Sequence, residues 1–303
     1  MPRPAVLLHL LVLAGFAVAG AAGASDVLTL GRISDDPRNH YAQLKPLLDY
    51  VVPRMREVGI RRGRVLMARD ARQMANYLRR GSVDWVTETP AMALQLQDSA
   101  NAQLLALTER NGVSEYRSYI IARSDSGINS LRDLAGRSIA FEHTASTSAY
   151  LVPAAELLGL GLRLEPLTAL GDTPQGDGVG YLFARSEANV AIWVAKGLVP
   201  AGAVSNLGWA NPRTVPATIH ADVTVIHRST PFPRALELVR DGLDPRVRAR
   251  LGQLLLAAAR DPEAAPALTA FFGTTAFLPI DGGLQRQLAQ LRGGLARVHR
   301  EVE

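Results

Sequence analysis

The chain has 303 residues, of which 48% are hydrophobic and 20% charged, a composition typical of a globular protein long enough for two lobes. Its formal net charge is +5, and the basic residues are nearly all arginines dispersed along the sequence. A dispersed excess of this size does not indicate nucleic acid binding, but it modestly favours small anionic ligands. Because the sequence contains no cysteine, disulfides, thiol catalysis, cysteine-bound zinc and a cysteine lipid anchor are excluded.

The first 24 residues have the pattern of a secretory signal peptide. Arg3 precedes an apolar run from Ala5 to Ala19, and a small-residue cleavage site comes directly before Ser25. The run is short for a membrane span, so a retained anchor is the less favoured alternative. We therefore expect a mature protein that is exported to the periplasm, soluble and not lipid-anchored.

The first half of the mature chain predicts strands that alternate with helices. Strands are expected over 27–33, 64–67, 83–87 and 103–108. Helices are expected over 40–55, 70–79 and 90–96, with Asp70 as a cap and Pro46 in a first turn. Such short connections indicate an open, largely parallel sheet, whose ligands bind at the carboxyl ends of the strands.

A second series of strands and helices follows. Strands are expected over 116–123, 138–141, 162–167, 202–205 and 222–227, and 181–184 fits either a strand or the start of a helix. Helices are expected over 150–158, 186–196, 246–259, 262–272 and 284–302, with Gly293 and Gly294 interrupting the last. The pattern therefore predicts a second series inserted in the first, because a helical tail with no sheet of its own follows it.

Three hydroxyl residues, Ser146, Thr147 and Ser148, stand where strand 138–141 leads into the next helix. Free backbone N–H groups and the positive end of the helix dipole lie at such a point, and together they can hold an anion. The alternative is that Ser146 or Ser148 only caps the helix. The local sequence leaves both interpretations open.

Six motifs follow one another between residues 28 and 233, and the resemblance that they support extends over about residues 27–279. They are LTLGRISDDP, RRGSVDWVTETP, YRSYIIARSDSGI, LRDLAGRSIAFEHTASTS, FARSEANVAIWVAKG and RSTPFP. In this order and spacing they resemble the phosphonate-binding protein family, the periplasmic substrate-binding proteins of phosphate, phosphite and phosphonate ABC transporters. The resemblance implies a two-lobe type II periplasmic binding fold of the α/β class, in which each lobe has an open, mostly parallel sheet.

The resemblance also implies how the lobes are divided and where a ligand would lie. The chain would cross between lobes near 116–121 and near 232–239, with lobe 1 formed by 25–117 and 236–303 and lobe 2 by 118–235. In this family the serine and threonine cluster holds the phosphono oxygens, which maps onto Ser146, Thr147 and Ser148. The first lobe would contribute His40, Tyr41, Glu88 and Thr89.

Two departures from the family pattern bear on the ligand. Ala149 replaces the glycine that usually follows the S-T-S motif. The segment 199–202 lacks the acid that pairs with the amine of aminoalkylphosphonates, which argues against a ligand such as 2-aminoethylphosphonate.

Four other residues have both a ligand-binding and a structural interpretation. His143 could donate to an anion and make binding depend on pH, or lie in a surface loop. Glu88 could contact a ligand, accept a hydrogen bond from Arg69, or stabilise the start of a helix through its charge. Glu187 could lie in the ligand cleft or cap its own helix. Tyr116 and Tyr119 fall on opposite faces of one strand, so at most one of them faces the cleft.

The sequence has no metal-ligand spacing, nucleophile elbow or phosphate-binding glycine loop, so no catalytic residue, metal or cofactor is expected. The leading hypothesis is a monomer that closes on a small oxyanion, mainly through neutral hydroxyl and backbone N–H groups, and delivers it to an ABC permease. The main alternative is a sensor that presents its closed form to a membrane sensor kinase. A hydrolase or transferase that depends on Ser146 is a third possibility.

Overall fold

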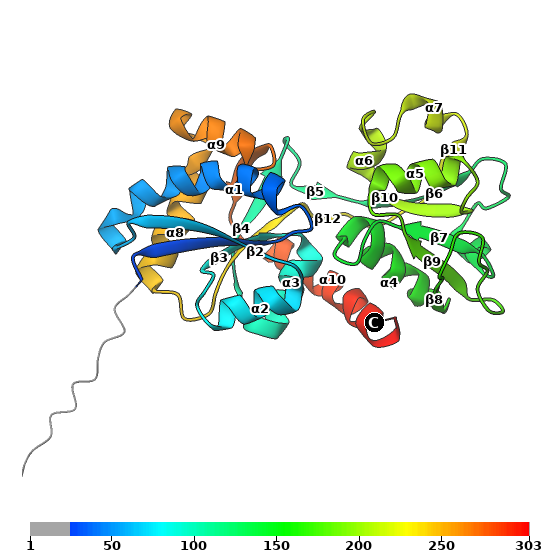
Figure 1. Cartoon of the computed structure of the whole chain (residues 1–303), viewed down its shortest axis with the longest axis horizontal. Helices are drawn as coiled ribbons and strands as arrows, with labels where there is room; N and C mark the ends of the chain where they lie inside the picture. Colours follow the sequence, from blue (N-terminus) through cyan, green and yellow to red (C-terminus); the bar gives the residue numbers. More distant parts are fainter. Residues whose placement is uncertain (1–24, 303) are drawn as a thin grey trace, which may run out of the picture.

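The computed structural model describes residues 25–302, which build two six-stranded sheets joined by a short pair of crossing strands (Figure 1). We call the part built on the first sheet lobe 1 and the part built on the second sheet lobe 2. The predicted signal peptide, residues 1–24, lies outside the described residues. Among the helices of residues 25–302, none has the length and apolarity that crossing a membrane would require.

The sheet of lobe 1 has the strand order β14-β4-β13-β3-β1-β2. Its strands are β1 (Val27–Ile33), β2 (Arg62–Ala68), β3 (Trp85–Glu88), β4 (Gln103–Arg110), β13 (Leu236–Val239) and β14 (Thr274–Leu278). Strands β1 to β4 run in one direction, and β13 and β14 run against them. The carboxyl ends of β1, β2, β3 and β4 therefore share one edge of the sheet.

The helices of lobe 1 follow the predicted ones closely. They are α1 (Pro37–Val51), α2 (Ala71–Arg79), α3 (Pro90–Ala100), α8 (Pro245–Ala258) and α9 (Ala265–Ala270), with 3-10 turns at η1 (Val52–Val58) and η4 (Pro262–Ala264). Asp70 caps α2 as predicted, because its carboxylate accepts from the Gln73 N–H at 2.7 Å. The expected place of Pro46 is wrong: Asp36 caps α1, which begins at Pro37, three residues before His40, so Pro46 lies in the helix interior.

The sheet of lobe 2 has the strand order β11-β6-β10-β7-β9-β8. Its strands are β6 (Ser118–Arg123), β7 (Ser138–Phe141), β8 (Leu164–Pro166), β9 (Val179–Phe183), β10 (Ala201–Ser205) and β11 (Val223–Arg228). Only β6 runs against the others. Its helical segments are η2 (Leu131–Leu134), the π-helical turn η3 (Thr147–Leu151), α4 (Val152–Gly159), α5 (Glu187–Ala195), α6 (Asn206–Ala210) and α7 (Ala217–His220).

The chain after residue 236 has no sheet of its own, as expected, but it is not wholly helical, because β13 and β14 return to the sheet of lobe 1. The apolar pattern of β13 is interrupted by Glu237, which is fully buried. Its carboxylate accepts hydrogen bonds from Trp85 Nε1, Thr87 Oγ1 and Thr108 Oγ1 at 2.6, 2.8 and 2.7 Å. A buried carboxylate that accepts three hydrogen bonds is compatible with a central strand. In the sequence, however, the charged residue interrupts the apolar run by which a buried strand is recognised.

The long strand predicted over 116–123 is in fact two strands. β5 (Glu115–Tyr116) pairs antiparallel with β12 (Phe232–Pro233) between the sheets, and β6 begins after Arg117. The Tyr116 and Phe232 rings pack edge to face with centroids 4.5 Å apart. The break allows the chain to leave one sheet and enter the other, so β5 and β12 form the connection between the lobes.

Helix α10 (Gly282–Glu301) contacts both lobes and is continuous, so the predicted interruption is wrong. A Cβ at Gly294 would lie 3.1 Å from the Cβ of Ala155 in α4, and the glycine therefore serves close packing. Arg297 donates to the Leu158 carbonyl of α4 at 3.3 Å, and Arg292 pairs with Asp98 of α3. In Figure 1 α10 runs from lobe 1 to the end of α4.

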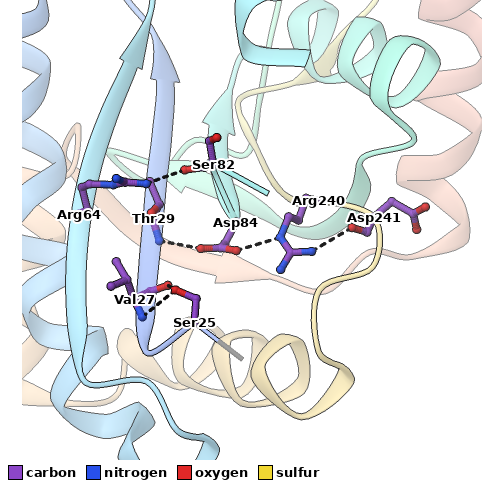
Figure 2. A network of polar contacts seen from close by, with 8 residues as sticks. All are labelled: Ser25, Val27, Thr29, Arg64, Ser82, Asp84, Arg240 and Asp241. Atoms are coloured by element: carbon purple, nitrogen blue, oxygen red, sulfur yellow. Dashed lines mark hydrogen bonds and ion pairs between the residues drawn. The ribbon is translucent and has the colours of Figure 1, made fainter. Parts of the chain in front are cut away.

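Asp84 connects three segments of lobe 1 (Figure 2). It directly precedes β3, so it lies at the edge of the sheet opposite to the carboxyl ends of β1 to β4. Its carboxylate accepts from the Thr29 N–H of β1 at 2.9 Å and from Arg240 Nε, after β13, at 2.9 Å. Both Asp84 and Thr29 are buried. Asp84 therefore has a structural role.

We expect Asp84→Ala to lower the free energy of unfolding by about 1–3 kcal/mol, because the buried Thr29 N–H loses its acceptor. Urea denaturation of the mature protein measures this. The control is Asp241→Ala at the exposed end of the same network, for which we expect a change below about 0.5 kcal/mol. Equal losses in both variants would contradict the structural role.

Candidate functional site

The start of α3 in lobe 1 meets the start of η3 in lobe 2. Thr147 Oγ1 accepts a hydrogen bond from the Ala91 N–H at 3.2 Å, and both residues are buried. Each is at a helix N-terminus that follows a strand of its own sheet, so the carboxyl edges of the two sheets face each other here. The space between the lobes is therefore lined by strand ends and helix starts.

The three hydroxyls of the S-T-S motif are buried and engaged with protein groups. Ser146 caps η3 by accepting from the Ala149 N–H at 3.1 Å, and it also hydrogen-bonds Glu142. Ser148 hydrogen-bonds the Tyr116 hydroxyl, whose pKa is raised by burial. The motif lies at the predicted strand-to-helix transition and organises this junction, while ligand binding by its hydroxyls stays a prediction.

Three arginines from different segments converge beside this junction. They are Arg32 near the end of β1, Arg110 at the end of β4, and Arg234 between β12 and β13. Burial, followed by the charges of Arg32 and Arg234, lowers the pKa of Arg110 to about 9. Arg234 follows β12 in the connection between the lobes, and its charge opposes the raised pKa of Glu187 in lobe 2.

This arginine cluster has donors without acceptors. Arg110 Nε and Nη2, Arg32 Nε and Arg234 Nε are all buried and have no hydrogen-bond partner. No ion pair within 4.0 Å in residues 25–302 joins a carboxylate to any of the three guanidinium groups. Buried donors in native proteins are almost always paired, so this arrangement is what an anion site needs before the anion arrives.

Aromatic rings pack against the guanidinium groups of all three arginines. The ring of Phe272 lies 4.6 Å from the Arg32 guanidinium carbon and 4.4 Å from that of Arg110, and Tyr116 lies 5.0 Å from that of Arg234. Phe272 has a φ of 56°, a strained backbone conformation for a bulky side chain. Such strain is often kept at functional sites, and here it holds one ring under two cations.

Glu88 and Glu237 offset part of this positive charge without pairing with it directly. Glu88 is buried and accepts from the Ile33 N–H at 2.6 Å and the Thr89 N–H at 3.3 Å. Burial raises its pKa, while Arg32 and Arg110 oppose the shift. Burial likewise raises the pKa of Glu237. Glu88 thus joins β1 to the start of α3, rather than accepting from Arg69.

A cavity of about 230 Å³ lies between the lobes beside Arg32. Of the predicted site residues, Glu88, Thr89 and His143 line it, and the Thr89 hydroxyl oxygen is buried without a partner. Burial lowers the pKa of His143, which favours its neutral form. His40 also lines the cavity, and burial lowers its pKa to about 4.

The remaining predicted residues lie apart from this cavity. Tyr41 is 48% exposed on α1 and is not among the lining residues. Tyr116 lies in the lobe connection, and Glu187 accepts from the Ser205 N–H at 2.7 Å and the Ser205 hydroxyl at 3.0 Å. Burial, together with the nearby Glu142, raises the pKa of Glu187 to about 7. Ser186 caps α5 instead.

The sequence interpretation missed all three arginines of the cluster. Arg32 and Arg110 stand at the ends of apolar strands, at the edge where ligands of open sheets bind, and this position was the available signal. Arg234 carried no local signal, since only the return of the chain through β12 brings it to the other two. Within residues 25–302 no group of three or more His, Asp or Glu side chains is arranged to hold a metal ion.

A family model described as ABC transporter, phosphonate, periplasmic substrate-binding protein matches residues 33–283. The chain belongs to this family. It is a periplasmic substrate-binding protein of the ABC transporters, in a family that is not an enzyme class. Membership implies a periplasmic location, a small-molecule ligand and a permease partner.

Solved structures share the fold of this chain. The chain is similar to XAC2383 from Xanthomonas citri bound to ATP, with 50% sequence identity, a TM-score of 0.87, and coverage of 92% of this chain and 100% of that chain. The same protein bound to a chloride ion gives a TM-score of 0.88. The binding protein component of an ABC phosphonate transporter from Pseudomonas aeruginosa, at 21% identity, shares the fold with a TM-score of 0.64 over 90% of this chain and 87% of that chain.

The shifted pKa of Glu187 gives a pH-dependent prediction. Because its pKa rises from 4.5 to about 7, the folded protein binds this proton more tightly than the unfolded chain. The resulting stabilisation is fully present below the unfolded pKa and is lost as pH rises through the folded pKa. We therefore expect Glu187→Gln to become more stable relative to the wild type as pH rises from 5 to 8, measured by urea denaturation.

The comparison of variant with wild type cancels other titrating groups, including His40, whose lowered pKa acts in the opposite direction. The matched control is Glu57→Gln at an exposed glutamate, whose difference from the wild type should not change over the same pH range. A Glu187→Gln difference that stays constant between pH 5 and 8 would show that the carboxyl group is already ionised at pH 5.

Proposed function

We propose that this protein captures a phosphorus oxyanion, of the phosphonate, phosphite or phosphate class or a larger phosphate ester, and delivers it to an ABC permease. The observation that carries the proposal is Arg110, which is only 6% exposed and has two buried N–H positions without an acceptor. With Arg32 and Arg234 it forms a positively charged group that lacks a partner anion. The ligand would supply that anion.

The chemistry of the cluster favours a ligand with several charged oxygens. Guanidinium groups donate in a planar fork that matches the oxygens of phosphate and carboxylate, and buried charge-assisted hydrogen bonds are among the strongest. Three guanidinium groups from different segments can each donate to a different oxygen of a tetrahedral phosphoryl or phosphono group. A flat carboxylate has only two oxygens to accept from them. The hydroxyls of Thr89 and of the S-T-S motif would then orient the oxygens rather than supply most of the binding.

The comparison with XAC2383 supports an anionic ligand. That protein has been solved with ATP and with a chloride ion, and half of its residues are identical to those of this chain. We propose that the binding cluster of this chain, Arg32, Arg110 and Arg234 with Thr89 and His143, accepts a phosphoryl or phosphono group. The remaining predicted contacts, Tyr41, Tyr116, Glu88 and Glu187, are proposed to support the site or to contact the ligand after closure.

We further propose a hinge mechanism without turnover. The lobes would comprise 25–117 with 236–303 and 118–235, and they would rotate about β5 and β12. The Thr147 to Ala91 hydrogen bond crosses between the lobes and would break on opening. The protein would act as a monomer after removal of residues 1–24. The match to the transporter family over residues 33–283 favours transport over presentation to a sensor kinase, so transport is the function we propose.

Replacing Arg110 tests the site through opposite effects on binding and stability. We expect Arg110→Met to weaken binding of phosphate or methylphosphonate by about 100-fold, since buried hydrogen bonds to a charged group contribute about 1.5–3 kcal/mol each. We expect the same change to stabilise the ligand-free protein by about 1–4 kcal/mol, because it removes a buried charge without a partner. Calorimetric titration and urea denaturation measure the two effects.

The matched control is Arg260→Met, which changes an exposed arginine after α8 and should alter neither quantity. Binding that is unchanged in Arg110→Met would contradict the proposed site. A ligand-free variant less stable than the wild type would show that Arg110 has a structural partner.

A further inference from the structure

A second cavity between the lobes adjoins the one beside Arg32. It has a volume of about 480 Å³, and Ile33 and Ala145 line both cavities. Organic ligands of drug size occupy sites of roughly 300–1,000 Å³, so this space is large enough for a substantial organic group. The two cavities together form an elongated space that starts beside Arg32, the one member of the arginine cluster that lines it, and continues past Ile33.

The wall that lobe 2 provides is aromatic. Tyr150, Tyr181 and Phe183 line the cavity and contact one another, with centroids 5.0 Å apart for Tyr150 and Phe183 and 5.7 Å apart for Tyr181 and Phe183. These rings come from η3 and from β9, the strand next to β7, so the sheet itself holds them in place. Tyr150 and Tyr181 are themselves buried, so the partly exposed Phe183 is the ring that this cluster presents most directly to a flat ligand group, with the two tyrosines holding it from behind.

The wall that lobe 1 provides is polar and positively charged. It includes Arg69 and Arg72 at the start of α2 and Gln95 of α3. The Arg69 guanidinium pairs with the neighbouring Asp70 at 3.2 Å and with no other carboxylate of residues 25–302, and Arg72 is exposed. A ligand group in this cavity would therefore lie between an aromatic wall and a rim of guanidinium groups.

We propose that this cavity receives a flat aromatic or heterocyclic substituent of the ligand, whose phosphoryl or phosphono group binds the arginine cluster. The ligand class is then an organic phosphate or phosphonate with a ring system, rather than inorganic phosphate or a methyl derivative. This inference rests on the proposed function, because the cluster must bind the anionic group for the ring to reach the aromatic wall. It adds a specificity site formed by Tyr150, Tyr181 and Phe183.

The test compares phenylphosphonate with methylphosphonate, which share one head group and differ only in the ring. We expect the wild-type protein to bind phenylphosphonate at least about tenfold more tightly, as burying a ring against aromatic side chains contributes beyond its area. Ala71→Trp fills the cavity from the first turn of α2 without altering the arginine cluster. This variant should lose the preference for phenylphosphonate and retain its affinity for methylphosphonate within about threefold.

The matched control is Ala257→Trp, at an exposed alanine of α8 in the same lobe, which should retain the wild-type preference. Equal wild-type affinity for the two phosphonates would overturn this inference and leave the proposed function standing. A preference for phenylphosphonate that survives in Ala71→Trp would overturn the placement of the ring. Failure of phosphate and both phosphonates to bind the folded wild type would overturn the proposed function as well.

Discussion

The burial of positive charge without a paired anion is the constraint on which the rest of this structure depends. Arg32, Arg110 and Arg234 lie close enough that the first and last lower the pKa of the second. Removing a charge from water costs several kcal/mol even after the protein relaxes. Glu88, Glu237 and the rings of Phe272 and Tyr116 offset part of that cost, so the ligand-free site is tolerated and is ready to bind an anion.

The fold places the arginine cluster next to β5 and β12, the strand pair that connects the lobes. Arg32 and Arg110 come from the sheet of lobe 1, and Arg234 follows the strand pair that connects the lobes. An anion that contacts all three would therefore connect one sheet to the hinge and favour one lobe orientation over another. Ligand binding shifts such an equilibrium by the difference in affinity for the two states. Helix α10, which packs on α3 and on α4, limits the movements that are available.

The parts of the fold with a local sequence signal were predictable. β1 and β7 have the predicted bounds because their apolar runs end at polar loops, and Asp70 caps α2 as its position indicates. β13 was missed because its buried Glu237 depends on donors from β3 and β4. The arginine cluster was missed for a related reason: Arg32 and Arg110 had only their places at strand ends as a signal, and in a chain rich in arginine only the tertiary fold distinguishes Arg234 from an exposed arginine.

The most direct test of the central claim is a crystal structure of the mature protein grown in sodium bromide, with anomalous data collected at the bromine edge. We expect an anomalous peak between the lobes within hydrogen-bond distance of Arg110 Nε or Nη2, the donors that lack an acceptor. Bromide suits this purpose because the similar XAC2383 has been solved with a chloride ion. Peaks confined to exposed arginines, with none at the cluster, would contradict the account.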